Sequence, residues 1–389
     1  MQEGYKQTEI GVIPEDWDCI AAKHLMKIET GSRNTEHKTD MGKYPFFVRS
    51  QKVEHIDTYH YDCEAVLTAG DGVGTGKVFH HYIGKFDAHQ RVYVMSNFDG
   101  ITGRYFYNYF SENFGNEVSK YTAKSSVDSV RRNMIAEMLI PTPTIPEQER
   151  IAETLSNVDS MISSLEKLIA KKKAVKQGAM QELLTGKKRL PGFIGEWYET
   201  TIGEHCCVFD GTHQTPKYTL AGIPFYSVEN VTANDFVNTK FITTEEHEQL
   251  SSKCKIEKGD ILMTRIGSIG DCKYIDWDVN ASFYVSLALI KCKETINAQF
   301  LSFYSTSSYF KKEIEIRSLL TAIPQKINLG PISEIRLNIP SDIKEQEAIA
   351  SILSDMDNEI EALEQKLEKT RQVKQGMMQQ LLTGKIRLV

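Results

Sequence analysis

A stretch of 44 residues occurs twice in this chain, and it decides the fold. The two copies are EQERIAETLSNVDSMISSLEKLIAKKKAVKQGAMQELLTGKKRL at 147–190 and EQEAIASILSDMDNEIEALEQKLEKTRQVKQGMMQQLLTGKIRL at 345–388. They align without a gap, and 25 of the 44 positions are identical. A weaker sequence similarity aligns Trp17 with Trp197. Because an internal repeat reports a duplicated architecture, we expect two half-repeats related by a pseudo-two-fold axis.

Each copy is predicted to be one long helix. Pro146 suits a first helical position, and Gly186 and Gly384 suit the C-terminal caps. Apolar residues recur at alternating steps of four and three, and eight of ten positions on this seam are apolar in each copy, which is the spacing of a coiled coil. The seam residues are Ile151, Leu155, Val158, Ile162, Leu165, Ile169, Lys172, Lys176, Ala179 and Leu183, then Ile349, Leu353, Met356, Ile360, Leu363, Leu367, Thr370, Lys374, Met377 and Leu381.

The charges along each predicted helix are segregated. Residues 147–169 carry five acids and two bases, whereas 171–189 carry seven bases and one acid. The second copy repeats this order, with eight acids and two bases over 345–369 and then basic residues. Antiparallel packing sets each acidic half against the other's basic half, so we expect an antiparallel coiled coil. In the alternative interpretation, each charge run is only a solvated helix face that complements its own dipole.

The rest of the chain has a different pattern. Residues 1–145 and 189–343 show short apolar runs separated by glycine and Asp-Gly turns, which predict mixed sheet with a few helices. The predicted fold class is therefore α/β (mixed α+β), with two globular domains separated by the two long helices. The predicted limits are 1–145 and 189–343 for the domains, and 146–188 and 344–389 for the helices. Apart from the similarity around Trp17 and Trp197, the two domains do not resemble each other in sequence.

Composition bounds the functional class. With 389 residues, 41% hydrophobic and 25% charged, the chain is predicted to fold as a soluble protein with at least two cores. No membrane-length apolar stretch or signal peptide is present, so we expect a cytoplasmic protein with no membrane partner. The seven cysteines lack zinc-site spacing and are predicted to be reduced and mostly buried. The net charge of −6 leaves nucleic-acid binding to a local patch.

No catalytic or metal-binding motif is evident. The run Gly70–Lys77 resembles a phosphate loop, but Asp71 stands where that motif has glycine and Val78 follows the lysine. We interpret it as a tight loop between two strands. His80 and His81 lack the companions of a metal site. The prediction is a protein with no catalytic residue and no metal ligand of its own.

Polar residues gathered in the glycine- and threonine-rich segments suit nucleic acid. Arginine and lysine pair with guanine edges or phosphates, glutamine pairs with adenine, and threonine contacts the backbone. Taken singly, each is more often a solvated loop residue, so the argument depends on their clustering. The predicted DNA-binding residues are Arg33, Arg49, Gln90 and Arg91 in the first domain, and Thr212, His213, Gln214, Lys217, Arg265 and Lys326 in the second.

With these features, the chain resembles a known family, the specificity subunits of type I restriction-modification systems. The similarity rests on the duplicated Ile-Pro, Glu-Gln-Glu and Ile-Ala elements at 140–152 and 339–350, and on LLTGK at 183–187 and 381–385. TEIGVIPEDW at 8–17, GDILMTR at 259–265 and QKIN at 325–328 add to it. These motifs span essentially the whole chain.

The resemblance implies two target-recognition domains that read the two halves of a split, asymmetric site in double-stranded DNA. It further implies that the helices set the spacing and dock two methyltransferase (modification) subunits, to which restriction/translocase subunits are added. S-adenosylmethionine, ATP and Mg would belong to those partners, with no cofactor in this subunit and no enzyme activity of its own. One departure is that the domains are slightly acidic, −3 over 1–140 and −4 over 191–340.

Two other classes of function stay open at this stage. The helix seams alone are also consistent with a structural coiled-coil adaptor that joins two protein-binding domains. A self-sufficient DNA enzyme is the second alternative. Salt-dependent affinity for duplex DNA would separate the first alternative from DNA recognition.

Overall fold

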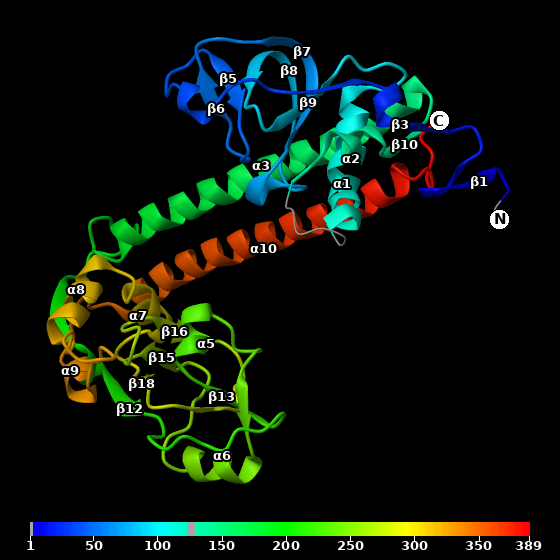
Figure 1. The fold of residues 1–389 in the computed structure, drawn as a ribbon. Helices are drawn as coiled ribbons and strands as arrows, with labels where there is room; N and C mark the ends of the chain where they lie inside the picture. The colour runs from blue at the N-terminus through cyan, green and yellow to red at the C-terminus, as the bar shows by residue number, and fades with distance from the viewer. Residues whose placement is uncertain (1–2, 123–128) are drawn as a thin grey trace. The chain divides into compact units, whose positions relative to one another are not determined.

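The computed structural model describes residues 3–122 and 129–389, and the chain divides into two compact units (Figure 1). The first unit comprises Met1–Lys167 and Gln365–Val389, and the second comprises Leu168–Glu364. Each unit therefore contains one of the two variable regions together with part of each repeated segment.

The first unit is built on a twisted sheet with strand order β4-β9-β7-β8-β5-β6. Strand β5 pairs in parallel with the end of β8, and the other neighbours in this order are antiparallel. Strands β1 and β2 form a hairpin, and β3 pairs with β10. The strands are β1 (Tyr5–Thr8), β2 (Gly11–Pro14), β3 (Asp18–Ala21), β4 (Lys27–Thr30), β5 (Tyr44–Phe47), β6 (Glu54–Ile56), β7 (Tyr61–Ala69), β8 (Phe79–Ala88), β9 (Val92–Ser96) and β10 (Leu139–Thr142).

Helix α1 (Gly103–Thr122) packs on this sheet, and α2 (Arg132–Ala136) lies beside α1 (Figure 1). The reason is a row of phenylalanines four residues apart. Phe106, Phe110 and Phe114 stack on one another with ring centroids 5.1 and 4.3 Å apart, and Phe79 of β8 meets Phe110 edge-on. Such pairs stabilise a core beyond their area alone, so this row fixes α1 on the sheet.

The second unit has a divided version of the same sheet. Its strand orders are β12-β18-β15-β16 and β14-β13-β17, and β11 pairs with β19. Its strands are β11 (Trp197–Thr201), β12 (Cys206–Asp210), β13 (Ile223–Tyr226), β14 (Lys240–Ile242), β15 (Ile261–Thr264), β16 (Cys272–Tyr274), β17 (Ser282–Phe283), β18 (Leu287–Cys292) and β19 (Arg336–Pro340). Its helices are α4 (Ile202–His205), α5 (Val228–Ala233), α6 (Thr244–Ser251), α7 (Ala298–Tyr304), α8 (Ser308–Arg317) and α9 (Leu329–Ser333).

The two variable regions share a topology that their sequences do not reveal. In the first unit, the end of β8 runs parallel to β5, with Phe47 opposite Ala88. In the second, β17 runs parallel to β13, with Tyr226 opposite Phe283. The antiparallel sets β4-β9-β7-β8 and β12-β18-β15-β16 also correspond in order. Because the two sequences are unlike, this common architecture is visible only in the structure.

A buried carboxylate braces the second unit. Glu313 of α8 is 3% exposed and lies 2.6 Å from Nη1 of Arg317 and 3.1 Å from Nη2 of Arg336. Burial alone would raise the pKa of Glu313, but the hydrogen bonds and charges of the two arginines outweigh burial and hold the pKa below its usual value. Glu313 is therefore ionised in the folded unit and ties α8 to the start of β19.

The predicted long helices are present as α3 (Ile145–Leu183) and α10 (Ile343–Leu381), each of 39 residues. They start one residue before the predicted limits and end at the last seam positions, five and eight residues before the limits at 188 and 389. The chain then turns at Gly186 and Gly384, whose φ angles are +69° and +70°. Glycine adopts this left-handed conformation without strain. The predicted division into four segments stays a prediction.

The seam prediction is confirmed. All twenty predicted seam side chains lie in the described part of the chain, and each is buried or partly buried. At the helix ends the seam joins the domain cores: Ile151 and Leu155 pack in the first core with Leu381, and Ile349 and Leu353 pack in the second with Leu183.

The antiparallel charge pairing is also confirmed within each unit. In the first, Lys374 lies 2.7 Å from Asp159 and Arg371 lies 2.6 Å from Glu166. In the second, the basic half of α3 pairs with the acidic half of α10, through Lys172 with Glu359, Lys173 with Glu364 and Lys176 with Asp357. Exposed pairs of this kind contribute at most about 1 kcal/mol each, so they select the orientation more than they stabilise it.

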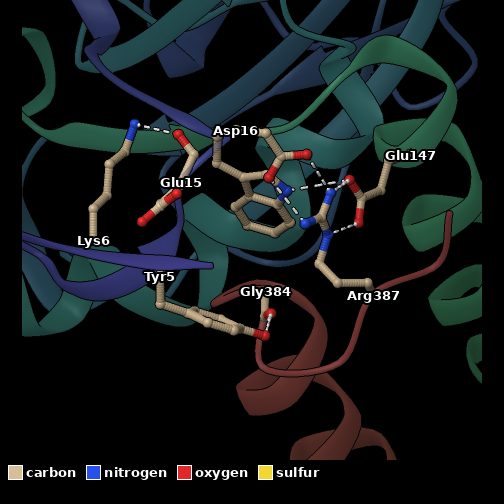
Figure 2. Close-up of polar contacts among 8 residues, drawn as sticks. Tyr5, Lys6, Glu15, Asp16, Glu147, Gly384 and Arg387 are labelled. Carbon is tan, nitrogen blue, oxygen red and sulfur yellow. Dashed lines mark hydrogen bonds and ion pairs between the residues drawn. The ribbon is translucent and has the colours of Figure 1, made fainter. Parts of the chain in front are cut away.

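A second set of contacts ties the C-terminal tail to the first unit (Figure 2). Arg387 donates from Nε to Oε1 of Glu147 at 2.6 Å and from Nη2 to Oε2 at 2.9 Å. It also donates to both carboxylate oxygens of Asp16, at 2.9 and 2.8 Å. Trp17 Nε1 donates to Glu147 Oε2 at 3.1 Å. Glu147 opens α3, so one carboxylate joins the start of that helix to the tail and to the N-terminal segment.

The second unit has the repeat counterpart of this junction, with one difference. Arg189 donates to both oxygens of Glu345, at 2.5 and 2.6 Å. Arg189 lies 198 positions before Arg387, and Glu345 lies 198 positions after Glu147, so the two ion pairs are equivalent in the repeat. The indole Nε1 of Trp197, however, has no hydrogen-bond partner among the described residues. The duplicated helices thus start from duplicated ion pairs, but among the described residues the tryptophan donates a hydrogen bond only at the first junction.

Two smaller predictions have different outcomes. The seven cysteines, all within the described residues, are free thiols, as expected. The expectation that most are buried is wrong: Cys206 is buried, Cys207 is exposed and the other five are partly exposed. Among the helices of the described residues, none is long and apolar enough to cross a membrane.

Candidate nucleic-acid interface

Four loops of the first unit meet at one end of its sheet and form what we call the first loop junction, residues 31–34, 70–74, 89–91 and 129–130. Backbone hydrogen bonds hold it together. Gln90 N donates to Arg33 O at 2.8 Å, Gly70 N donates to Arg91 O at 2.8 Å, and Val130 N donates to Gly70 O at 2.8 Å. The junction is therefore fixed by main-chain atoms, whatever side chains it carries.

Gly31 shows how closely the loops pack. A Cβ atom at this position would lie 2.1 Å from the carbonyl oxygen of Ala88. No side chain fits at that distance, so a glycine is required where the chain leaves β4. Gly211 holds the matching place after β12, where a Cβ would lie 2.3 Å from the carbonyl oxygen of Phe283.

The structure brings together all four residues predicted in the first domain. Arg49 and Arg91 both pair with Asp71, and Arg33 donates to Oδ2 of the fully buried Asp87 at 3.0 Å. Gln90 donates through its side-chain amide to Asn34. Three guanidinium groups and an amide thus gather around one loop junction, which is the clustering on which the prediction depended.

Asp71 is a member of this group that sequence reasoning missed. Burial alone would raise the pKa of Asp71, but hydrogen bonds from Arg49 and Arg91 and their charges hold it below its usual value. His89, in contrast, has a lowered pKa because of its burial and the nearby charge of Arg49. The residues present are therefore an ionised carboxylate, a neutral imidazole and a set of cations.

The interpretation of Gly70–Lys77 as a tight loop between strands is confirmed. It connects β7 to β8, which are antiparallel neighbours, and contains a single short 3-10 turn at Gly72–Gly74. A phosphate loop leads from a strand into a helix whose N-terminus faces the phosphates. This loop leads into a strand, so the geometry of a nucleotide site is not present here.

The second unit contains the second loop junction, residues 211–214, 265–270, 284–286 and 326–327, with the same main-chain connections. Val285 N donates to Thr212 O at 3.0 Å, as Gln90 does to Arg33. Arg265 N donates to Ser286 O at 2.9 Å, as Gly70 does to Arg91. Ile327 N donates to Arg265 O at 2.9 Å, as Val130 does to Gly70. The two junctions therefore match residue by residue while their side chains differ.

Most predicted residues of the second domain lie at this junction. Thr212, His213 and Gln214 line a cavity of about 770 Å³, and His213 Nε2 lies 2.7 Å from Asp210. Lys326 is exposed, and its backbone pairs with Ile266 and Leu319. Lys217 is exposed further along the loop that follows β12. Neither lysine lines this cavity.

The placement of Arg265 does not support it as a direct DNA contact. Arg265 is 7% exposed and donates to the carbonyl oxygens of Ile327 at 3.2 Å and Val285 at 3.3 Å. Burial lowers the pKa of its guanidinium, which the charge of Asp210, 3.6 Å away, partly offsets. Its side chain braces the second loop junction from inside. The carbonyls that enclose it come from residues distant in sequence, so no local pattern distinguishes it from Arg33 or Arg91.

No group of three or more potential metal-ligating side chains is found among residues 3–122 and 129–389. The polar groups at the loop junctions are instead mainly cations, amides and hydroxyls, with the Asp71 carboxylate paired to Arg49 and Arg91. These are the groups that recognise phosphates and base edges.

Two domains of one topology, each presenting its own set of polar loop residues, are typical of a modular recognition protein. A family model described as the type I restriction modification DNA specificity domain matches residues 14–177 and again 196–371. These two matches span most of the chain, which therefore belongs to the type I restriction-modification specificity family. It is a DNA-recognition subunit, and this family binds DNA and assembles in complexes with other subunits.

Named specificity subunits match this chain over its full length or over part of it. The chain is 26% identical over 432 residues to a putative type I restriction enzyme MjaX specificity subunit of Methanocaldococcus jannaschii, covering 100% of this chain and 97% of that protein. It is 30% identical over 154 residues to the type I restriction enzyme EcoDI specificity subunit of Escherichia coli, covering 40% and 34% of the two chains.

A solved structure agrees in fold. The S subunit of a type I restriction-modification system from M. genitalium matches with a TM-score of 0.66 at 18% identity, covering 98% of this chain and 99% of that one. The predicted fold class and DNA-recognition function are confirmed, and the adaptor interpretation is set aside.

Proposed function

We propose that the two loop junctions are the DNA-reading sites and that each reads one half of a bipartite, asymmetric target. The observation that carries this proposal is that matched main-chain positions present different side chains. Arg33 corresponds to Thr212, Arg91 corresponds to Ser286, and Gly70 corresponds to Arg265, on the pattern of backbone hydrogen bonds. Because base edges are read by side chains, two junctions with unlike side chains would read unlike half-sites.

We also propose that the long helices dock two methyltransferase subunits. The sequence Val-Lys-Gln-Gly is retained at 175–178 and 373–376, and Val175 and Val373 are both about half exposed. A Cβ at Gly178 or Gly376 would meet no atom within 4 Å. Two identical exposed patches on equivalent helices suit two copies of one partner, to which restriction/translocase subunits would be added.

Catalysis and cofactors belong, in this proposal, to those partners. The chain would recognise DNA in the cytoplasm and leave S-adenosylmethionine, ATP and Mg to the methyltransferase and restriction subunits. The test is incubation of DNA with labelled S-adenosylmethionine, ATP and Mg, with this chain alone and with its methyltransferase. Methyl transfer or strand cleavage by the isolated chain would contradict the proposal.

A domain exchange tests the bipartite reading. Residues 1–145 are replaced by the first domain of another family member, and the chain is expressed with its methyltransferase for base-resolution mapping of methylation. We expect one half-site to change and the other to persist. Exchange of 189–343 is the matched control and should change only the other half-site. A change of both half-sites by either exchange would show that the two domains do not read independently.

A further inference from the structure

The most concentrated charge cluster at the first loop junction is a carboxylate between two arginines. Asp71 Oδ1 accepts from Nη1 of Arg49 at 3.0 Å, and Asp71 Oδ2 accepts from Nη1 of Arg91 at 2.7 Å. The three residues come from different loops: Arg49 follows β5, Asp71 follows β7 and Arg91 precedes β9. One carboxylate therefore fixes two guanidinium groups relative to each other.

The carboxylate of this cluster is more buried than its two arginines. Asp71 is 18% exposed, whereas the side chains of Arg49 and Arg91 are 47% and 62% exposed. A guanidinium carries five N–H donors, and Asp71 engages one nitrogen of each. The carboxylate thus lies behind a pair of outward, oriented cations, and their remaining N–H groups can face a ligand.

A hollow adjoins this cluster. It encloses about 390 Å³, and its lining includes Asp71, Gln90, Arg91 and Tyr93. The backbone N–H of Gln90 donates to the carbonyl oxygen of Arg33, so Gln90 belongs to the same loop junction. The hollow therefore has an amide, a guanidinium and a carboxylate at its wall, which is a set of both donors and acceptors.

We propose that Asp71 is a positioning residue that holds Arg49 and Arg91 as a paired reader of a G·C base pair in the first half-site. This rests on the proposed location of the DNA-reading site. Guanine offers the acceptors N7 and O6 in the major groove, which arginine contacts with two donors. Two arginines held in a fixed orientation by the carboxylate behind them can supply these donors.

A phosphate fits the cluster less well. An ionised Asp71 adds a negative charge beside any phosphate that approaches Arg49 or Arg91, and like charges repel at this range. A base edge is uncharged and does not incur this repulsion. A carboxylate between two arginines weakens their attraction to a phosphate more than their hydrogen bonding to an uncharged base edge, so the arrangement favours base reading.

The cluster is specific to the first domain. Asp71 forms an isolated bridge with Ser129, and the equivalent bridge in the second unit joins Ile266 to Lys326. Arg91 is matched by Ser286 in the backbone connections. The second loop junction therefore has neither the carboxylate nor the second arginine at these places, and the effect of Asp71 should be confined to one half-site.

The experiment expresses the full chain with its methyltransferase and measures methylation of a library in which each base pair of both half-sites is varied. The variants are Asp71→Asn, Asp71→Ala, Arg49→Ala and Arg91→Ala. Asp71→Asn keeps the shape of the side chain and removes its charge. The matched control is Glu137→Gln, which breaks the exposed pair with Lys23 elsewhere in the same unit.

We expect both Asp71 variants and at least one arginine variant to lose discrimination at the same G·C pair of the first half-site, by roughly tenfold or more. Discrimination in the second half-site should be unchanged, which also shows that each variant is folded. The Glu137 control should keep the original profile.

Three results would overturn the proposal, and they can be told apart. If an arginine variant relaxes one position but both Asp71 variants keep every preference within twofold, the DNA-reading site stands and Asp71 has no positioning role. If the Asp71 variants lower methylation of all sequences alike, the cluster serves stability or phosphate binding. If neither arginine variant changes any preference, the location of the reading site is itself wrong.

Discussion

The junction of Arg387 with Glu147 gives a stability prediction that can be worked out from the structure. Glu147 is 1% exposed and is held by two hydrogen bonds from Arg387 and one from Trp17. Arg387→Ala leaves this carboxylate buried with the indole as its remaining side-chain donor. Removal of one partner from a buried ion pair typically costs about 3–5 kcal/mol, because the other charge stays uncompensated.

The ion pair between Arg387 and Asp16 adds little to this loss of stability. Asp16 is more than half exposed, and an exposed ion pair contributes at most about 1 kcal/mol. The total loss should therefore lie near 3–5 kcal/mol and should fall on the first unit. Arg371→Ala is the matched control, because Arg371 pairs with the half-exposed Glu166 in the same unit and its loss should cost under about 1 kcal/mol.

Peptide-resolved hydrogen exchange is the suitable assay, since a chain with two compact units does not guarantee two-state unfolding. Amides around Trp17 and at the start of α3 should exchange roughly two to four orders of magnitude faster in Arg387→Ala, while the second unit serves as the internal reference. Addition of Glu147→Gln should restore part of the protection, because it removes the uncompensated charge. An Arg387→Ala chain that is no less protected than Arg371→Ala would refute the reasoning.

Three further predictions follow from other sites. Because the pKa of Glu313 is held below its usual value, its contribution to stability is present above about pH 4 and is lost as the pH falls through the folded pKa; Glu313→Gln should flatten the acid limb of the second unit's unfolding free energy. Val175→Asp and Val373→Asp should each reduce the methyltransferase stoichiometry from two to one by native mass spectrometry, whereas Met161→Asp, exposed outside the repeated patch, should not. Arg265→Ala should destabilise the second unit by about 1–3 kcal/mol, because two buried carbonyls lose their donors. It should also lower discrimination at every base pair of the second half-site together. Loss of discrimination at a single base pair in methylation mapping would instead show that Arg265 contacts that base.

The long helices could be predicted because their determinants are local. Seam residues such as Leu155 and Leu353 recur at coiled-coil spacing, and the charge order along each copy selects the antiparallel pairing. The structure adds only where each helix stops. Leu183 and Leu381 end the helices because the chain must reverse at the glycines that follow, and a helix end is less sharply determined by sequence than its register.

The loop residues could be predicted as a set but not individually. Arg91 and Arg265 both lie beside short apolar runs, Arg91 before VYVM at 92–95 and Arg265 after ILMT at 261–264, and look alike in sequence. One is exposed beside a carboxylate, and the other is enclosed by carbonyls of Val285 and Ile327. That difference is decided by which distant loops close over the side chain. In the sequence, Asp71 stands out only as a departure from the phosphate-loop pattern, since its partners lie 20 and 22 residues away.

The common topology of the two domains explains how unlike sequences build matching junctions. Each junction is closed by main-chain hydrogen bonds at equivalent places, and these bonds do not depend on side-chain identity. The requirement falls instead on a few glycines such as Gly31 and Gly211, where a Cβ would collide with a neighbouring carbonyl. Positions such as Arg91 and Ser286 then differ while their backbone bonds are kept. A protein that must read many different targets with one scaffold needs this separation between the atoms that hold the loops and the atoms that face the DNA.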